Sequence, residues 1–219
     1  MAAPQIAPPK ILMLSLHGYV GAEPELGLPD TGGQVVFVLE LAKQFRELGH
    51  SVDVVTRQFE DQPEVDDMGG NLRVWRIPFG GSGFIRKEDM HDHLDEFVRV
   101  FLDVAGDGGY DVVNSHYWDA GYAGQRISEE LRIAHVHTPH SLGAWKRQDM
   151  AGDKQQIESN YRFEERIRKE FLTFRRCDHV IATVSYTHLR AHETYEGIAD
   201  AGLSVKKRGG GGGGGGGGG

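Results

Sequence analysis

A buried strand followed by a glycine pair at a helix start constrains this chain more than any other feature. Residues 10–16 form an apolar run typical of a strand buried on both faces of a parallel sheet. A long loop leads to Gly32 and Gly33, and residues 33–48 then carry apolar side chains at helical spacing. Because the first N–H groups of a helix lack intrahelical partners, such a glycine-lined start can bind an anion. A glycine pair that only allows close packing of the helix on the sheet is the alternative interpretation.

The same order of strand and helix repeats along the chain. Further strands are predicted at residues 51–56, 72–77, 111–115, 132–137 and 178–183, and further helices at 88–104, 120–131 and 158–176. Repeated βα units of this length connect by right-handed crossovers. The sequence therefore predicts an α/β fold with a Rossmann-like, doubly wound parallel sheet, in one domain over residues 1–183.

The remaining residues, 184–219, differ from the rest of the chain. They lack the apolar spacing of a strand or a helix and are glycine only from Gly209 to Gly219. The segment resembles translated sequencing-adaptor read-through followed by a homopolymer. We interpret it as an artefactual or disordered tail, with a genuine glycine-rich linker as the alternative.

Composition narrows the choice of partners. The formal net charge of −8 is unfavourable for nucleic-acid binding, and the single cysteine, Cys177, leaves no internal disulfide. No apolar run reaches the length of a membrane span, and prolines interrupt the N-terminal segment where a signal peptide would lie. We expect a cytoplasmic protein with neither nucleic-acid nor membrane partners.

Polar side chains follow several predicted strands, at the edge where parallel strands end. Lysines and helix N-termini suit a phosphate, whereas Tyr, His and Gln suit sugar hydroxyls. The edge thus has the composition of a site for a phosphorylated sugar. The residues concerned are His17, Gln34, Lys87, His116, Tyr117, His140 and Lys146.

Two groups of side chains near this edge are each compatible with a purely structural role. His135 and His137 share one face of a strand and could ligate a metal together with another histidine, although packed and hydrogen-bonded histidines are commoner. The basic side chains of residues 162–169 alternate with glutamates, a pattern typical of an exposed, salt-bridged helix face.

Six segments resemble the N-terminal half of the sucrose-phosphate synthase group of retaining GT-B glycosyltransferases. The resemblance extends over residues 10–183, and it is strongest to the branch that moves mannose from GDP-mannose to fructose 6-phosphate. It implies that the predicted sheet is the N-terminal half of a GT-B fold. The segments are His17-Gly18-Tyr19, Asp30 to Val36, Thr56 to Pro63, Arg76 to Gly81, Asn114 to Gly121 and His137 to Gly143.

The resemblance also implies roles for individual residues. Gly32 and Gly33 would lie against the donor diphosphate and the acceptor sugar, and Gln34 would hydrogen-bond the acceptor. His140 would lie at the transfer centre, where a front-face displacement lets the leaving phosphate take the acceptor proton. Neither a metal nor a cofactor is implied. The residues implied to bind fructose 6-phosphate are Lys87, Tyr117, Lys146 and Arg166.

Members of that group carry a second Rossmann-like domain that binds the nucleotide sugar. The chain ends before such a domain, so we expect it to hold only the acceptor-binding half and to be inactive alone. Three alternatives remain: a sucrose-phosphate synthase or sucrose synthase that uses UDP-glucose, a non-catalytic domain that binds sugar phosphates, and a metal hydrolase built on the histidines.

Overall fold

The computed structural model describes residues 7–24 and 27–182, so the tail predicted at 184–219 lies outside the described residues. Within this part, seven strands form one sheet in the order β3-β4-β2-β1-β5-β6-β7. All neighbouring strands are parallel except β3, which pairs antiparallel with β4. The strands are β1 Lys10–Leu14, β2 Ser51–Gln58, β3 Val65–Asp67, β4 Leu72–Pro78, β5 Val112–His116, β6 Ala134–Thr138 and β7 His179–Val180.

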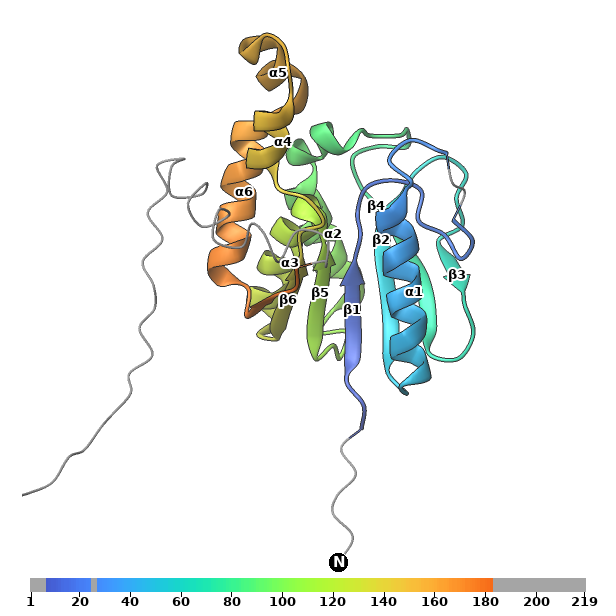
Figure 1. Ribbon diagram of the computed structural model, residues 1–219. Coiled ribbons are helices and arrows are strands. Elements are labelled where there is room, and N and C mark those ends of the chain that lie inside the picture. Colours follow the sequence, from blue (N-terminus) through green and yellow to red (C-terminus); the bar gives the residue numbers. More distant parts are fainter. Residues whose placement is uncertain (1–6, 25–26, 183–219) are drawn as a thin grey trace, which may run out of the picture.

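Helices cover both faces of the sheet, as the doubly wound fold requires. Figure 1 shows α1 in front of the sheet and α2 and α3 behind it, with α4 and α5 above the carboxyl ends of the strands. The helices are α1 Gly33–Glu47, the 3₁₀ helix η1 Lys87–Asp92, α2 Leu94–Ala105, α3 Tyr117–Leu131, α4 Gly143–Asp149, α5 Lys154–Tyr161 and α6 Phe163–Arg176. No helix among these is long and apolar enough to cross a membrane.

Strand β1 contributes to two separate apolar cores. Ile11 and Met13 pack with the buried face of α1, whereas Leu12 and Leu14 pack with residues of α2 and α3 on the other side. A strand buried on both faces is apolar throughout instead of alternating. The predicted buried strand is therefore confirmed, although β1 ends at Leu14.

Two predicted helices are each interrupted in the structure. The pattern over residues 88–104 divides into η1 and α2, with His93 between them. The pattern over residues 158–176 divides into α5 and α6 at Arg162, whose φ of 49° is left-handed. No glycine or proline marks either break, so the charged and apolar spacing continues across both.

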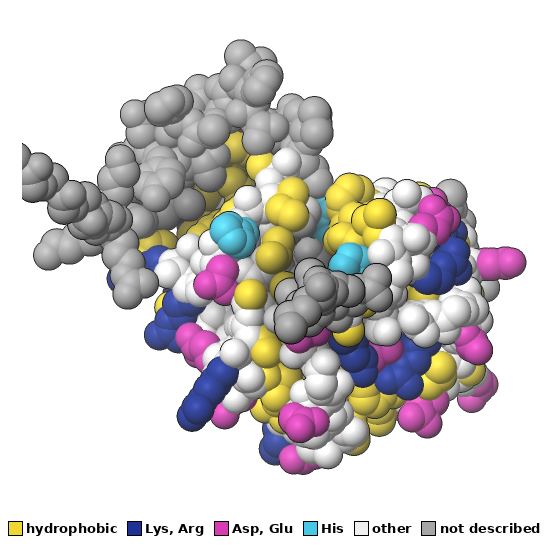
Figure 2. Space-filling model, turned by 90° about the horizontal axis from the view of Figure 1, so that it is seen from below, with side chains coloured by type: hydrophobic (Ala, Val, Ile, Leu, Met, Phe, Trp, Pro, Cys, Tyr) yellow, Lys and Arg dark blue, Asp and Glu magenta, His cyan; other side chains and the backbone are white. Residues whose placement is uncertain are grey.

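The outer face at the amino ends of the strands is of mixed charge. Figure 2, viewed from that side, shows Lys and Arg side chains interspersed with Asp and Glu. Mixed charge of this kind does not attract a polyanion. Near the opposite edge, by contrast, Lys87 of η1, Lys146 of α4 and Arg166 of α6 line one pocket.

Candidate active site

The sheet has a topological switch point between β1 and β5. From β1 the chain proceeds outward through β2 and β4 on one side and returns to β5, β6 and β7 on the other. In open α/β sheets, ligands bind in the crevice beyond the carboxyl ends of the strands at such a point. His17 follows β1 and Tyr117 follows β5 directly, so both predicted edge residues lie at the switch point.

The glycine pair at the start of α1 is not required for packing. Gly32 is the N-cap residue, and no side chain caps this helix. A Cβ atom added at Gly32 or Gly33 would meet nothing within 4 Å. The interpretation that these glycines exist for close helix–sheet packing is therefore wrong for this fold. Gln34, the next residue, donates from Nε2 to the Ser15 hydroxyl over 3.4 Å at the end of β1.

Three of the predicted phosphate-binding cations line one pocket of about 350 Å³. Lys87 comes from the start of η1, Lys146 from α4 and Arg166 from α6, so three separate elements supply the positive charge. Two carboxylates and several apolar side chains complete the wall. The full lining is Lys87, Glu88, His91, Trp118, Lys146, Asp149, Met150, Tyr161, Phe163 and Arg166.

Tyr117 joins two of these cations. Its hydroxyl accepts hydrogen bonds from Arg166 Nη1 at 3.0 Å and from Lys146 Nζ at 3.3 Å. The Arg166 guanidinium also lies over the Tyr117 ring, 4.7 Å from its centroid. All four residues predicted to bind the sugar phosphate are thus brought to one place, with Lys87 across the pocket.

Arg166 is held rigidly because it is buried between an acid and a hydroxyl. Its Nε donates to Glu170 Oε1 at 2.8 Å, and Nη2 donates to the Ser141 backbone carbonyl and hydroxyl at 3.1 Å. Burial would lower the pKa of Arg166, but Glu170 and Tyr117 together raise it above its ordinary value, so the group stays cationic. Only 5% of Arg166 is exposed.

Lys87 is tied to the loop that precedes the glycine pair. Its ammonium group forms an ion pair with Asp30, and its backbone N–H donates to the same carboxylate at 3.3 Å. Burial would raise the pKa of Asp30, but the hydrogen bonds from Lys87 and its positive charge hold that pKa below its ordinary value. The loop before α1 and the cation pocket are therefore connected through one ion pair.

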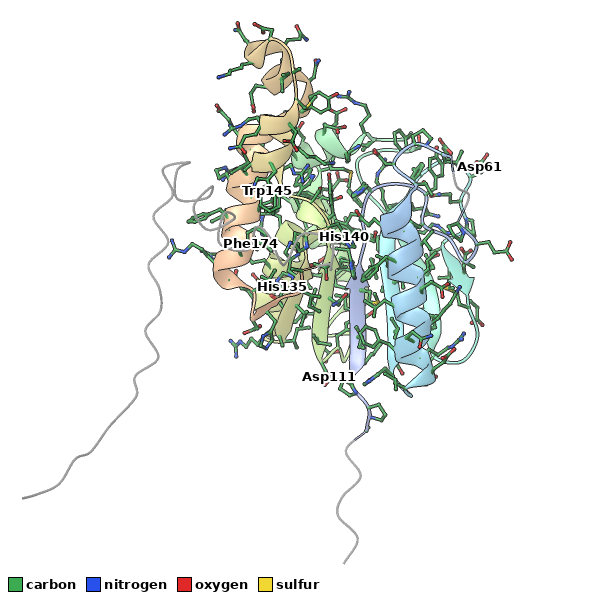
Figure 3. All side chains as sticks on the ribbon, viewed as in Figure 1. Asp61, Asp111, His135, His140, Trp145 and Phe174 are labelled. Atoms are coloured by element: carbon green, nitrogen blue, oxygen red, sulfur yellow. The ribbon has the colours of Figure 1, made fainter. Side chains whose placement is uncertain are left out.

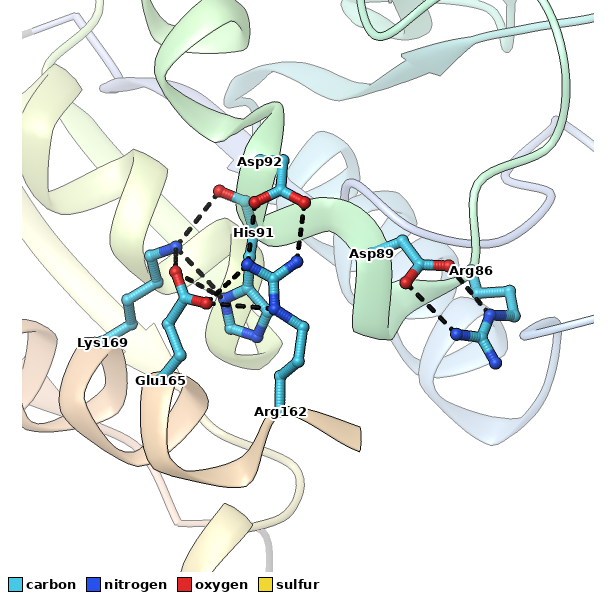
Figure 4. A network of polar contacts seen from close by, with 7 residues as sticks. All are labelled: Arg86, Asp89, His91, Asp92, Arg162, Glu165 and Lys169. Carbon is cyan, nitrogen blue, oxygen red and sulfur yellow. Dashed lines mark hydrogen bonds and ion pairs between the residues drawn. The ribbon is translucent and has the colours of Figure 1, made fainter. Parts of the chain in front are cut away.

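Another correction concerns the charged segment 162–169. Its pattern predicts an exposed helix face, but Lys169 is only 4% exposed. Lys169 Nζ donates to the His91 backbone carbonyl at 3.2 Å and to Glu165 at 2.9 Å, which fixes the wall of the pocket (Figure 4). Arg162, the residue that precedes α6, binds both oxygens of Asp92 at 2.7 and 2.8 Å. Arg162, Glu165 and Lys169 thus join the start of α6 to η1.

His140 lies at the carboxyl ends of the central strands, in the loop from β6 to α4 (Figure 3). Its Nε2 is 3.0 Å from Nδ1 of His116, and Phe37 of α1 packs edge-on against its ring at 5.3 Å. Burial, and to a smaller extent the nearby His17, lowers the pKa of His140 to about 4. The imidazole is therefore neutral at pH 7.

Three of the six non-glycine residues with positive φ in the described part of the chain lie among these residues. The φ angles of Tyr117, His140 and Asp30 are 75°, 56° and 55°, in the left-handed region that residues other than glycine rarely adopt. Such strain persists only where the surroundings determine the conformation, and it gathers at functional sites. The sequence alone identifies Tyr117 and His140 as candidate site residues, whereas Asp30 is noted in the sequence only as the first residue of a motif.

The pair of His17 and Asp119 was not predicted. His17 Nδ1 lies 2.8 Å from Asp119 Oδ2, and the carboxylate is fully buried. His17 is a predicted edge residue, but nothing in the sequence indicates its partner 102 positions away. The His17 ring also packs against Tyr117, with centroids 4.7 Å apart.

The two strand histidines form a polar layer inside the fold. His135 Nε2 and His137 Nδ1 both lie within hydrogen-bond distance of the Ser115 hydroxyl, at 2.7 and 2.9 Å. Gly121 of α3 makes room for them, because a Cβ there would come within 2.5 Å of the His137 ring. In the part of the chain that the structure describes, no three His, Cys, Asp or Glu side chains are grouped to hold a metal ion.

The fold is that of the N-terminal half of a GT-B glycosyltransferase. A solved sucrose-phosphate synthase from Thermosynechococcus elongatus superposes with a TM-score of 0.73 at 26% identity, covering 84% of this chain and 45% of that one. The sequence profile of Glycosyltransferase Family 4 matches residues 31–201. The chain belongs to this glycosyltransferase family. The match continues beyond residue 183, so the predicted domain end there stays a prediction.

Two curated relatives refine the comparison. The chain is 52% identical to a mannosylfructose-phosphate synthase of Agrobacterium fabrum over 181 residues, 80% of this chain and 40% of the relative. It is 33% identical to a probable sucrose-phosphate synthase of Thermosipho melanesiensis over 78% of this chain and 44% of the relative. The chain thus spans less than half the length of these relatives.

Proposed function

We propose that the chain is the acceptor-binding half of a retaining glycosyltransferase that moves a hexosyl group to fructose 6-phosphate. GDP-mannose is the favoured donor, since the relative at 52% identity is a mannosylfructose-phosphate synthase. A sucrose-phosphate synthase using UDP-glucose is the second candidate, supported by the relative at 33% identity. Turnover is proposed only together with a second, donor-binding domain.

The observation that carries the proposal is the convergence of Lys87, Lys146 and Arg166 on one pocket beside Tyr117. A phosphate dianion needs several fixed cations, and Arg166 adds a permanent positive charge to those of the two lysines. Because Arg166 is already held by Glu170 and Tyr117, little reorganisation accompanies binding.

The sugar ring would lie between this pocket and the start of α1. Gly32 and Gly33 leave open space there, and the free N–H groups of the helix start face a developing or bound negative charge. His140 lies on the adjoining loop and is neutral, so it can donate one hydrogen bond without adding charge. Catalysis of this kind depends on positioning and charge stabilisation.

Calorimetric titration of the 219-residue chain with fructose 6-phosphate and with free fructose tests the acceptor assignment. We expect weak binding of the phosphate ester, weaker binding of fructose, and a loss of the difference in Lys146→Ala. Lys154→Ala is the matched control, because Lys154 is exposed and lies outside the pocket lining. Equal binding of both sugars, or of the ester by wild type and Lys146→Ala, would refute the phosphate-binding role.

A further inference from the structure

Asp119 fixes the tautomer of His17. The carboxylate is fully buried in the first turn of α3, where the helix dipole favours its negative charge. A carboxylate only accepts hydrogen bonds, so the 2.8 Å contact places the hydrogen on His17 Nδ1. A neutral His17 therefore carries its lone pair on Nε2.

His116 fixes the opposite tautomer at His140. His116 is fully buried, and its Nε2 has no hydrogen-bond partner within residues 7–24 and 27–182. If Nε2 carried the hydrogen, a buried N–H would lack an acceptor, which is rarely seen in folded proteins. His116 thus holds its hydrogen on Nδ1 and donates to His140 Nε2 over 3.0 Å. A neutral His140 then carries its hydrogen on Nδ1.

The two rings lie near each other at the carboxyl ends of the strands, because His116, which contacts His140, directly precedes Tyr117, which packs against His17. His17 and His140 are near enough that a charge on His17 lowers the pKa of His140. Neither His17 Nε2 nor His140 Nδ1 is among the buried, unpartnered atoms of the described residues. Phe37 holds the His140 ring from α1, and Tyr117 holds the His17 ring from α3.

We propose that Asp119 and His116 are positioning residues that set opposite roles for two outer nitrogens, so that His17 offers an acceptor and His140 a donor to the hydroxyl groups of a sugar bound at this edge. A sugar hydroxyl both donates and accepts, so such a pair fits it. The assignment of the two tautomers does not depend on the proposed function. Only the claim that a sugar contacts the two nitrogens rests on the proposed function.

Long-range ¹H–¹⁵N NMR of the histidine rings tests the tautomers without any ligand. Spectra are recorded at roughly pH 8.5, about two units above the ordinary imidazole pKa, and His17→Gln and His140→Gln assign the signals. We expect the hydrogen on Nδ1 in both rings of the wild type. A hydrogen on Nε2 of either ring would overturn the proposal, and the tautomers are read from the wild-type spectrum, for which the two variants supply only the assignment.

Two variants then address each partner separately. Asp119→Asn keeps the shape of the side chain, and in carboxylate–imidazole pairs the amide inverts the tautomer. We expect the hydrogen of His17 to move to Nε2 while His140 is unchanged. His116→Phe removes the donor and should let His140 exchange between tautomers, whereas His116→Asn restores a donor and should keep the hydrogen on Nδ1. A His140 signal unaffected by His116→Phe would refute the positioning role.

Titration with fructose 6-phosphate separates this inference from the proposed function. Loss of one neutral hydrogen bond raises a dissociation constant about two- to tenfold, so Asp119→Asn should weaken binding by a factor in that range. If Asp119→Asn inverts the tautomer but binds like wild type, the sugar does not use His17 and the inference fails. If the wild type shows the expected tautomers but binds no sugar phosphate, the proposed function fails and the tautomer assignment stands.

Discussion

Replacing Gly33 by alanine distinguishes a ligand-facing glycine from a packing glycine. A Cβ at Gly33 meets nothing within 4 Å, and the residue is the first of helix α1. Alanine is favoured over glycine in a helix by up to about 1 kcal/mol, and less at its first position. We therefore expect the unfolding free energy to be unchanged or raised by at most that amount, with a Tm shift between zero and about +4 °C.

The matched control is Gly121→Ala in helix α3. Its Cβ would come within 2.5 Å of His137, which is fully buried and bonded to Ser115. Overpacking of this kind costs about 1–3 kcal/mol, more than the gain in helix propensity. We expect Gly121→Ala to lower the Tm, in contrast to Gly33→Ala.

Calorimetric unfolding and titration with fructose 6-phosphate together give the answer. Gly33→Ala should keep its stability and lose affinity, because the methyl group occupies the space where the sugar phosphate is proposed to bind. Destabilisation by Gly33→Ala would show that the glycine serves the fold after all. Unchanged affinity would remove the start of α1 from the binding site.

Three more predictions concern pH, a buried ion pair and turnover. Burial lowers the pKa of His116 to about 3 and that of His140 to about 4, so between about pH 6.5 and 4 the unfolded chain binds protons that the native chain does not. Stability should be full above about pH 6.5 and fall by about 1.4 kcal/mol per pH unit for each such histidine, and His140→Gln should reduce the slope in urea titrations. Arg166→Met should cost about 3–5 kcal/mol because Glu170 is left buried without its cation, and adding Glu170→Leu should recover most of the loss in the same unfolding assay. With a donor-binding half supplied, His140→Ala should lower kcat by about 10²–10³, whereas Lys146→Ala should chiefly raise the KM for the acceptor in steady-state assays.

The order of strands and helices could be predicted because each buried strand is a short apolar run. β2, β4, β5 and β6 all overlap the predicted ranges, and the parallel sheet follows from their alternation with helices. β3 was not predicted, since Val65–Asp67 is short, antiparallel and mostly exposed at the sheet edge. The break at Arg162 was also missed, because tertiary contacts to Asp92 hold a left-handed residue that no local signal marks.

At the site, sequence reasoning found the side chains but not their partners. Lys87, Lys146 and Arg166 were grouped through resemblance, and they line one pocket in the structure. Asp30 and Asp119 were not identified as partners, because an ion pair between residues far apart depends on loop conformation that periodicity does not encode. The buried state of Arg166 was missed for a related reason, since an alternating charge pattern looks the same whether its face is covered or not.

The two-sided burial of β1 has a consequence for its alignment in the sheet. In a strand with one polar face, the alternation of apolar and polar residues fixes the register. In β1, a shift by one residue would move Leu12 and Leu14 into the core that Ile11 and Met13 occupy, and both cores would stay apolar. Polar contacts at the amino end favour the observed alignment, since the backbone N–H of Lys10 donates to Asp111 at 2.7 Å and its ammonium donates to the Gly108 carbonyl at 3.0 Å. Slippage by one residue would carry His17 about 3.3 Å along the strand axis and away from Asp119. Anchors at the far end of the strand thus help to determine whether His17 can reach Asp119 at the carboxyl edge.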